Sequence, residues 1–99
     1  MYLIVWRYVV RPEKVTEFIA AYGPGGAWSE LFARAEGYGG TELYRQEEEP
    51  AQFLTIDRWR GAADFDLFRA SFGRDYLSLD EQFAELTVEE ERIGAIERG

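Results

Sequence analysis

The sequence predicts an α+β protein with the ferredoxin-like β-α-β-β-α-β order and an antiparallel sheet. Three observations carry this prediction. A run of β-branched and aromatic residues opens the chain, two shorter runs flank a polar turn in its middle, and helical spacing separates these runs. The 99 residues contain no internal repeat and no linker, so a single domain is predicted to span residues 1–99.

The first half of the chain supplies one strand and two helical pieces. Residues 2–10 contain neither Gly nor Pro and are apolar at odd and even positions alike, apart from Arg7, so this strand needs cover on both faces. Pro12 suits a first helical turn. The apolar residues after it have the i, i+3, i+4, i+7 spacing of an amphipathic helix: Val15, Phe18, Ile19 and Tyr22. A second short helix is predicted over 28–34, between two glycine-rich breaks.

A β-hairpin is predicted for the middle of the chain. Residues 41–46 alternate between polar and apolar, and residues 53–59 are rich in β-branched and aromatic side chains. The polar turn Glu47-Glu48-Glu49-Pro50 separates the two strands. Leu54 and Ile56 oppose the apolar side chains on the other face of the second strand, so this strand is also apolar on both faces.

The last third of the chain is predicted to be a helix followed by a strand. Helical spacing runs over 61–72, is interrupted at Gly73 and resumes over 74–85. Residues 92–97 alternate enough to form the last strand. Helix and strand remain competing interpretations for 87–92.

The two strands that are apolar on both faces predict a homodimer. A ferredoxin-like sheet carries its helices on one side only, which would leave an exposed apolar patch larger than monomers usually tolerate. A symmetric partner sheet packed face to face would cover this patch. The alternative is a monomer whose loops or C-terminus cover the sheet.

Composition excludes several kinds of chemistry. The chain has no Cys and no His, so it offers no thiolate nucleophile, no thiol or imidazole metal ligand and no imidazole general base. Any chemistry must therefore come from carboxylates, Arg, Lys, Tyr, Trp, backbone groups or a borrowed cofactor. The net charge of -8 argues against nucleic-acid and anionic-membrane partners. The acidic runs at 47–49 and 89–91 lack the pattern of a calcium loop and are predicted to be solvated surface.

The N-terminal apolar run is not a targeting signal. Arg7 breaks it, no basic region precedes it and no small-residue cleavage site follows it. It is also shorter than the roughly 20 residues of a membrane span. The expected location is therefore the cytoplasm.

Short segments along nearly the whole chain match a known pattern. They are residues 9–13, 18–22, 37–43, 53–59, 65–68 and 76–80, together with Ile93-Gly94. These segments resemble the antibiotic biosynthesis monooxygenase-like family, in the dimeric α+β barrel superfamily. Most of the matching positions are packing residues, so the resemblance bears on the fold more than on the reaction.

The resemblance implies a cavity between sheet and helices in each subunit. In some members this cavity oxidises phenols or quinols with molecular oxygen and needs neither metal nor flavin, while others bind and degrade haem. The axial histidine of the haem-degrading members has no counterpart in a chain without His. Members with oxygenase activity often carry a His near the end of the helix after the third strand, where this chain reads Phe68-Arg69-Ala70-Ser71-Phe72.

Asp57 and Arg7 are the candidate catalytic residues. Asp57 shares a strand face with aromatic side chains, where a carboxylate would have a raised pKa and abstract a phenolic proton. The alternative is an ion pair with a nearby Arg. Arg7, the lone charge on its strand, would stabilise a substrate anion. Its alternative is an ion pair with a carboxylate of the next strand or of the dimer partner.

Large aromatic residues are the candidate lining of the pocket for a small aromatic molecule. The predicted substrate-binding residues are Trp6, Tyr8, Trp28, Trp59, Phe68, Phe72 and Tyr76. The competing interpretation is that these rings are plain core, or, for Tyr76, that it fixes its helix against the sheet together with Asp80.

Three functions follow from these candidates. The first is a cofactor-independent monooxygenase that oxidises a small aromatic phenol or quinol. The second is a non-catalytic dimeric binding or stress-related protein that uses the same pocket. The third is a structural dimer with a filled core.

Overall fold

The computed structural model describes residues 1–98 and has the predicted α+β ferredoxin-like fold. Its strands and helices, in chain order, are β1 (Tyr2–Val10), α1 (Val15–Tyr22), α2 (Ala27–Phe32), β2 (Tyr38–Arg45), β3 (Gln52–Trp59), α3 (Ala62–Phe83) and β4 (Thr87–Glu97). Single 3₁₀ turns at Pro12–Lys14 and Ala84–Leu86 precede α1 and β4.

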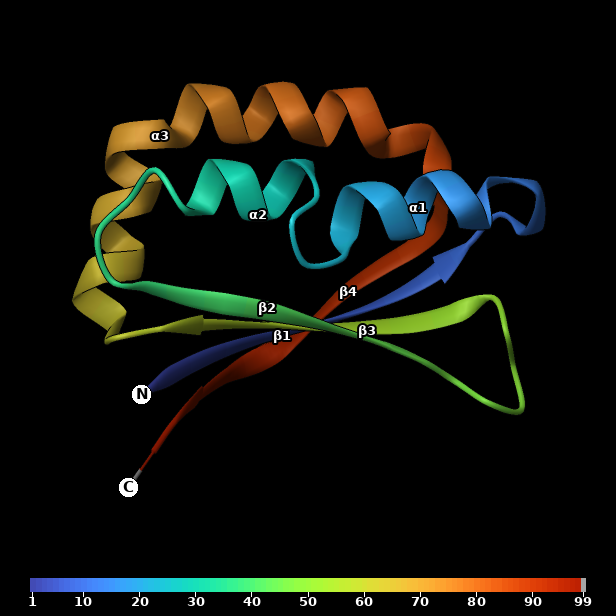
Figure 1. The fold of residues 1–99 in the computed structure, drawn as a ribbon, viewed down its shortest axis with the longest axis horizontal. Coiled ribbons are helices and arrows are strands. Elements are labelled where there is room, and N and C mark those ends of the chain that lie inside the picture. Colours follow the sequence, from blue (N-terminus) through green and yellow to red (C-terminus); the bar gives the residue numbers. More distant parts are fainter. Residues whose placement is uncertain (99) are drawn as a thin grey trace.

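The structure has two layers (Figure 1). The four strands form one sheet in the order β2-β3-β1-β4, and every neighbouring pair is antiparallel. All three helices lie on the same face of this sheet, with α3 crossing above α1 and α2 (Figure 1). The two strands at the centre of the sheet are β1 and β3, which are the two that the sequence marks as apolar on both faces.

β2 begins at Tyr38, three residues before the predicted start at Thr41. Gly40 has a φ of 113°, a conformation that favours glycine, and the pairing register with β3 shifts between Tyr38 and Gly40. The glycines that predict a break in the sequence therefore form a bulge inside the strand.

The C-terminal elements settle two open points. α3 runs through Gly73 without ending, and the interruption is a kink at Phe72, whose φ and ψ are -118° and 20°. Residues 87–92 belong to β4, so the strand interpretation is confirmed and the helix interpretation is wrong. Pairing with β1 explains this result, because Thr87 lies opposite Val10 and the residues that follow continue the ladder.

The core fills the space between the sheet and the helices. Every second residue of β3, from Phe53 to Trp59, is buried. The largest side chains that are almost completely enclosed are Trp59, Phe18, Phe68, Ile4 and Val10. Aromatic rings make most of these contacts: Phe18 stacks on Tyr22 with ring centroids 4.3 Å apart, and Phe68 lies 5.3 Å from Trp59.

Within residues 1–98, no helix covers the opposite face of the sheet (Figure 1). Because directly paired residues share a face, the register assigns to this side the apolar residues Leu3, Val5, Val9, Leu54, Ile56 and Ile96. Ile96 is 54% exposed, and Tyr44 beside Leu54 is 49% exposed. These apolar side chains share the face with the ion pairs that Arg7 forms with Glu89 and Glu91 and that Arg58 forms with Glu42.

Arg7 lies on the uncovered face as well. Its guanidinium pairs with Glu89 at 3.1 Å and with Glu91 at 3.2 Å, both on the neighbouring strand β4. Arg7 is predicted either to stabilise a substrate anion or to form an ion pair, and in the structure it forms an ion pair with the next strand.

No helix within residues 1–98 is both long enough and apolar enough to cross a membrane.

Candidate active site

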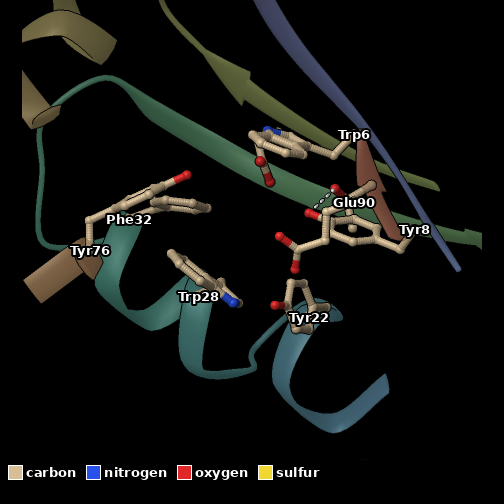
Figure 2. A pocket seen from close by; sticks show the side chains of 9 residues that line it. Trp6, Tyr8, Tyr22, Trp28, Phe32, Tyr76 and Glu90 are labelled. Carbon is tan, nitrogen blue, oxygen red and sulfur yellow. Dashed lines mark hydrogen bonds between the residues drawn. The ribbon is translucent and has the colours of Figure 1, made fainter. Parts of the chain in front are cut away.

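A cavity opens between the helix-covered face of the sheet and the three helices (Figure 2). Its lining combines aromatic rings with two carboxyl groups and consists of Trp6, Tyr8, Tyr22, Trp28, Phe32, Thr55, Asp57, Tyr76 and Glu90. The cavity is narrow, with a volume of about 40 Å³, and is open to solvent on one side. This is less than the roughly 150 Å³ of a cavity that encloses benzene, so a ligand with one aromatic ring has to extend into the opening.

Strand alternation places five lining side chains on the same face of the sheet. Trp6 and Tyr8 are two residues apart on β1, as Thr55 and Asp57 are on β3, and successive odd or even positions of a strand share a face. Trp6 lies opposite Thr55, and Tyr8 lies opposite Glu90 of β4. The floor of the cavity is therefore set by the register of three strands.

The helices supply the walls. Trp28 and Phe32 are four residues apart on α2 and so lie on one side of it, while Tyr22 ends α1 and Tyr76 comes from α3. The ring of Trp28 meets Tyr76 edge-on with centroids 5.0 Å apart, and Tyr8 meets Tyr22 in the same way at 5.1 Å. These contacts hold the rings in fixed orientations around the cavity (Figure 2).

Asp57 is the most unusual group in the site. Its side chain is buried, with 8% exposed, and among residues 1–98 no Lys or Arg forms an ion pair with it. Its carboxylate accepts a hydrogen bond of 2.7 Å from the Thr41 hydroxyl, which is also hydrogen-bonded to the Tyr38 hydroxyl. Burial raises the pKa of Asp57 to about 6, although the hydrogen bond from Thr41 opposes the rise.

The three lining tyrosines are held in their neutral form. Burial raises the pKa values of Tyr8, Tyr22 and Tyr76 above the ordinary value for a phenol. A neutral phenol can both donate and accept a hydrogen bond. One such bond is already made, from the Thr55 hydroxyl to the Tyr8 hydroxyl at 3.4 Å.

Glu90 is the second carboxyl group of the cavity. It is exposed and still lines the cavity, so it lies at the opening. Its carboxylate accepts a hydrogen bond of 3.2 Å from the Thr87 hydroxyl, and partial burial raises its pKa. The run 89–91 is predicted to be solvated surface. Strand alternation places Glu89 and Glu91 on the uncovered face, where they pair with Arg7, and places Glu90 on the face of the cavity.

The family model for antibiotic biosynthesis monooxygenases matches residues 1–72. The chain belongs to this family. No curated protein matches the chain in sequence. The match to the family model confirms the predicted family membership.

Solved structures share the antibiotic biosynthesis monooxygenase fold. A Bordetella bronchiseptica protein whose name assigns it to these monooxygenases is 22% identical, with a TM-score of 0.77 over 99% of this chain and 96% of that one. SnoaB from Streptomyces nogalater, a cofactor-independent oxygenase, is 20% identical, with a TM-score of 0.74 over 99% of this chain and 92% of that one. A conserved protein from Methanosarcina mazei has a TM-score of 0.73 at 20% identity, over 99% and 92% of the two chains. At these identities the likeness concerns the fold.

Five of the nine residues that the sequence singles out line the cavity of this family member: Trp6, Tyr8, Trp28, Asp57 and Tyr76. The other four lie elsewhere. Trp59 and Phe68 are 1% exposed within the core, because α2 and α3 close over them. Phe72 lies at the kink of α3, with the Arg34 guanidinium 4.9 Å from its ring centroid, and Arg7 is on the uncovered face.

The remaining lining residues are not singled out in the sequence: Tyr22, Phe32, Thr55 and Glu90. Tyr22 and Phe32 belong to the apolar faces of their helices and look there like ordinary core. Thr55 shares the alternation of Asp57 on β3, so the strand pattern is the signal that could have found it. Glu90 can be placed at the cavity only once the pairing register of β4 with β1 is known.

The indole of Trp28 has an unmet hydrogen-bonding requirement. Trp28 is 7% exposed, and its Nε1 is completely buried without a well-formed hydrogen bond to any of residues 1–98, although it is close enough to Tyr22 to lower the pKa of that phenol as a donor. A buried polar group without a partner is uncommon, because it loses its hydration and gains nothing in return. Figure 2 shows this nitrogen at the end of the ring that faces the side of Tyr22 and Glu90.

The part of the chain that the structure describes contains no group of three or more His, Cys, Asp or Glu side chains that could hold a metal ion.

Replacing Thr41 by Val tests the environment of Asp57. The substitution removes the hydrogen bond that stabilises the ionised carboxylate, so we expect the pKa of Asp57 to rise further above its ordinary value. The measurement is an NMR titration of the Asp57 carboxyl carbon. Thr41→Ser keeps the hydroxyl and serves as the matched control. An unchanged titration in Thr41→Val would mean that this hydrogen bond does not reach the carboxylate in solution.

Proposed function

We propose that this chain is a cofactor-independent monooxygenase that oxidises a small phenol or quinol in the cavity. One observation carries the proposal: a buried carboxyl group with a pKa of about 6 and no ion-pair partner among residues 1–98 lies in a cavity walled by aromatic rings. Family membership is consistent with this reaction, and SnoaB, which shares the fold, is a cofactor-independent oxygenase.

Asp57 takes the proton from the substrate hydroxyl. With a pKa of about 6 it is mostly ionised at neutral pH and is a stronger base than an ordinary carboxylate. Thr41 holds the carboxylate in place from the side of β2. Removal of the proton turns the phenol into a more electron-rich phenolate, which gives electrons to oxygen more readily.

The electrons come from the substrate itself. For hydroquinone, one molecule of quinol and one of O₂ give one hydroxyquinone and one water. One oxygen atom forms the new bond to a ring carbon, while the other leaves as water with the hydrogen atoms that the ring loses. The protein contributes a base, a binding site and exclusion of water, and all three can be supplied without the His and Cys that the chain lacks.

Aromatic side chains hold the ring of the substrate. Trp6 lies on the sheet side of the cavity, and Trp28 and Tyr76 lie on the helix side (Figure 2). A planar substrate between them gains stacking and edge-to-face contacts and leaves its hydroxyl groups for the polar groups of the lining. Trp59 and Phe68 support these residues from the core, and Arg7 has no part in this site.

Oxygen uptake with hydroquinone, catechol and their methyl derivatives tests the proposal. We expect uptake faster than in buffer, one O₂ consumed per quinol, and one ¹⁸O atom from labelled O₂ in the product. Asp66→Asn, an exposed substitution on α3, is the matched control and should leave the rate unchanged. Binding without turnover would overturn the enzymatic proposal and favour the alternative, a non-catalytic binding protein. Release of hydrogen peroxide in place of ring oxygenation would also contradict it.

We also propose that the chain is a homodimer through the uncovered face of the sheet. The apolar side chains on this face come from the central strands, and Arg7 is neutralised there by two glutamates of its own chain. Such a face suits a second copy of itself, since a sheet-to-sheet contact buries both patches at once.

Ile56→Asp should convert the dimer to a monomer. Ile56 lies opposite Val5 near the middle of the uncovered face, and a pair of carboxylates buried there would oppose association. Analytical ultracentrifugation measures the outcome. The control is Leu67→Asp, which is on α3 and 61% exposed, and it should leave the dimer intact. A wild-type chain that sediments as a monomer at micromolar concentration would contradict the proposal.

A further inference from the structure

The cavity is lined by carboxyl groups, and two arginines lie just outside it: Arg92 opposite Trp6 on β4, and Arg69 with its guanidinium 4.9 Å from the ring centroid of Tyr76. The lining itself contains two carboxyl groups, from Asp57 and Glu90, and neither Lys nor Arg. Arg7, the cation nearest in sequence to the lining residues of β1, is paired with two glutamates on the other face of the sheet. The chain as a whole carries a net charge of -8. A ligand inside the cavity therefore meets two carboxyl groups and no cation among the lining residues, which favours a cationic ligand over an anionic one.

The walls of the cavity suit a cation equally well. Six aromatic side chains line it, including Trp6, Tyr22 and Trp28. The face of an aromatic ring carries negative charge density and attracts an ammonium group, and Trp does so most strongly. Cages of aromatic rings with an adjacent carboxylate are well suited to organic cations, because the rings replace water around the charge and the carboxylate neutralises it.

A further observation points to a ligand with an acceptor atom. Trp28 is more than nine-tenths buried and lines the cavity, and its indole N–H lies by the Tyr22 side chain without a well-formed hydrogen bond to any residue in 1–98. A hydroxyl or carbonyl oxygen on the ligand would meet this requirement. The cavity therefore favours a ligand that combines an oxygen acceptor with a positive charge.

We propose that the substrate of this site is a phenol or quinol that carries a protonated amino group. Its hydroxyl oxygens are placed among Asp57 and the Trp28 N–H, and its ammonium group lies at the opening against Glu90. This assignment rests on the proposed function for the oxidation step, but the recognition of a cationic phenol stands on the cavity alone.

Three probes that differ in charge test the assignment: tyramine as the cation, 4-propylphenol as the neutral analogue and 3-(4-hydroxyphenyl)propanoate as the anion. Their dissociation constants are measured without oxygen by tryptophan fluorescence. We expect tyramine to bind at least tenfold more tightly than 4-propylphenol, and the anion to bind most weakly. The difference between tyramine and 4-propylphenol should shrink as salt is added, because Glu90 is exposed.

Glu90→Gln separates charge recognition from shape. We expect it to weaken tyramine binding about tenfold and to leave 4-propylphenol unchanged, while Glu89→Gln, one residue away on the other sheet face, changes neither. Equal binding of tyramine and 4-propylphenol, equal loss of both in Glu90→Gln, or no saturable binding of any probe would overturn the assignment. Tight tyramine binding without oxygen uptake would remove the proposed reaction and leave the assignment standing. Oxidation of neutral quinols without preference for the cation would do the reverse.

Discussion

Asp57→Asn should lower kcat/KM for quinol oxidation by about 10²- to 10⁴-fold, the contribution typical of a positioned general base. Asn retains the shape of the side chain and accepts the hydrogen bond from Thr41 through its carbonyl oxygen, but it cannot take a proton. In the wild-type protein kcat/KM should rise with pH and level off above a midpoint near 6, which is the pKa of Asp57. The variant should lack this rise. A variant with an unchanged rate would exclude Asp57 as the base.

The same substitution should stabilise the protein at neutral pH. The pKa of Asp57 is about 6 in the folded chain and 3.8 as the reference value, so between these values the folded state binds more protons than the unfolded state. The contribution of Asp57 to stability therefore falls as the pH rises from about 4 to 6. The two pKa values differ by about 2 units, which corresponds to about 3 kcal/mol at pH 7.

Urea denaturation of the wild type and of Asp57→Asn across this pH range measures the effect. The difference between their free energies of unfolding isolates Asp57, because the other carboxylates contribute to both proteins. We expect the difference to be small near pH 4 and to grow in favour of the variant up to about pH 7. A variant that is less stable than the wild type at pH 7 would show that the buried carboxylate is compensated by an interaction absent from the structure.

Phe68→Ala should cost about 3–5 kcal/mol of unfolding free energy, as expected for a large ring removed from a core. Phe68 is 1% exposed and touches rings from β3 and α2, with centroids 5.3 Å from Trp59 and 5.2 Å from Phe32. Phe32 also lines the cavity, so Phe68 packs directly against a residue of the cavity wall.

Phe72→Ala is the matched control on the same helix. Phe72 is only partly buried, at the kink of α3, and its removal should cost clearly less. Urea denaturation at one pH gives both values. A Phe68→Ala variant that loses less than about 1 kcal/mol would mean that this ring is not part of the packed core.

The fold was predictable from the sequence because local pattern and packing agree. The alternation of β3, the two-faced apolar pattern of β1 and the helical spacing that ends at Tyr22 each match what the structure contains. The exceptions are local. Gly40 forms a bulge where a break is predicted, and the interruption predicted at Gly73 is a kink at Phe72 within α3.

The site was predictable only in part, because burial depth is a tertiary property. Trp28 and Trp59 have the same chemistry in the sequence, yet Trp28 lines the cavity and Trp59 is enclosed in the core. The position of Glu90 depends on the register of β4, which shifts against β1 between Val5 and Trp6. Counting along the sequence cannot locate such a shift, and every residue beyond it changes its face.

The most direct test of the proposed site is the indole ¹⁵N–¹H spectrum of the protein during titration with hydroquinone under argon. Trp28 and Trp59 both have a buried Nε1 without a partner, but only Trp28 lines the cavity. Substitution of each Trp by Phe assigns the signals. The proposed function requires that the Trp28 indole signal shifts with saturation while the Trp59 signal stays in place. Saturable binding that leaves the Trp28 signal unmoved would place the substrate elsewhere on the protein and contradict the account.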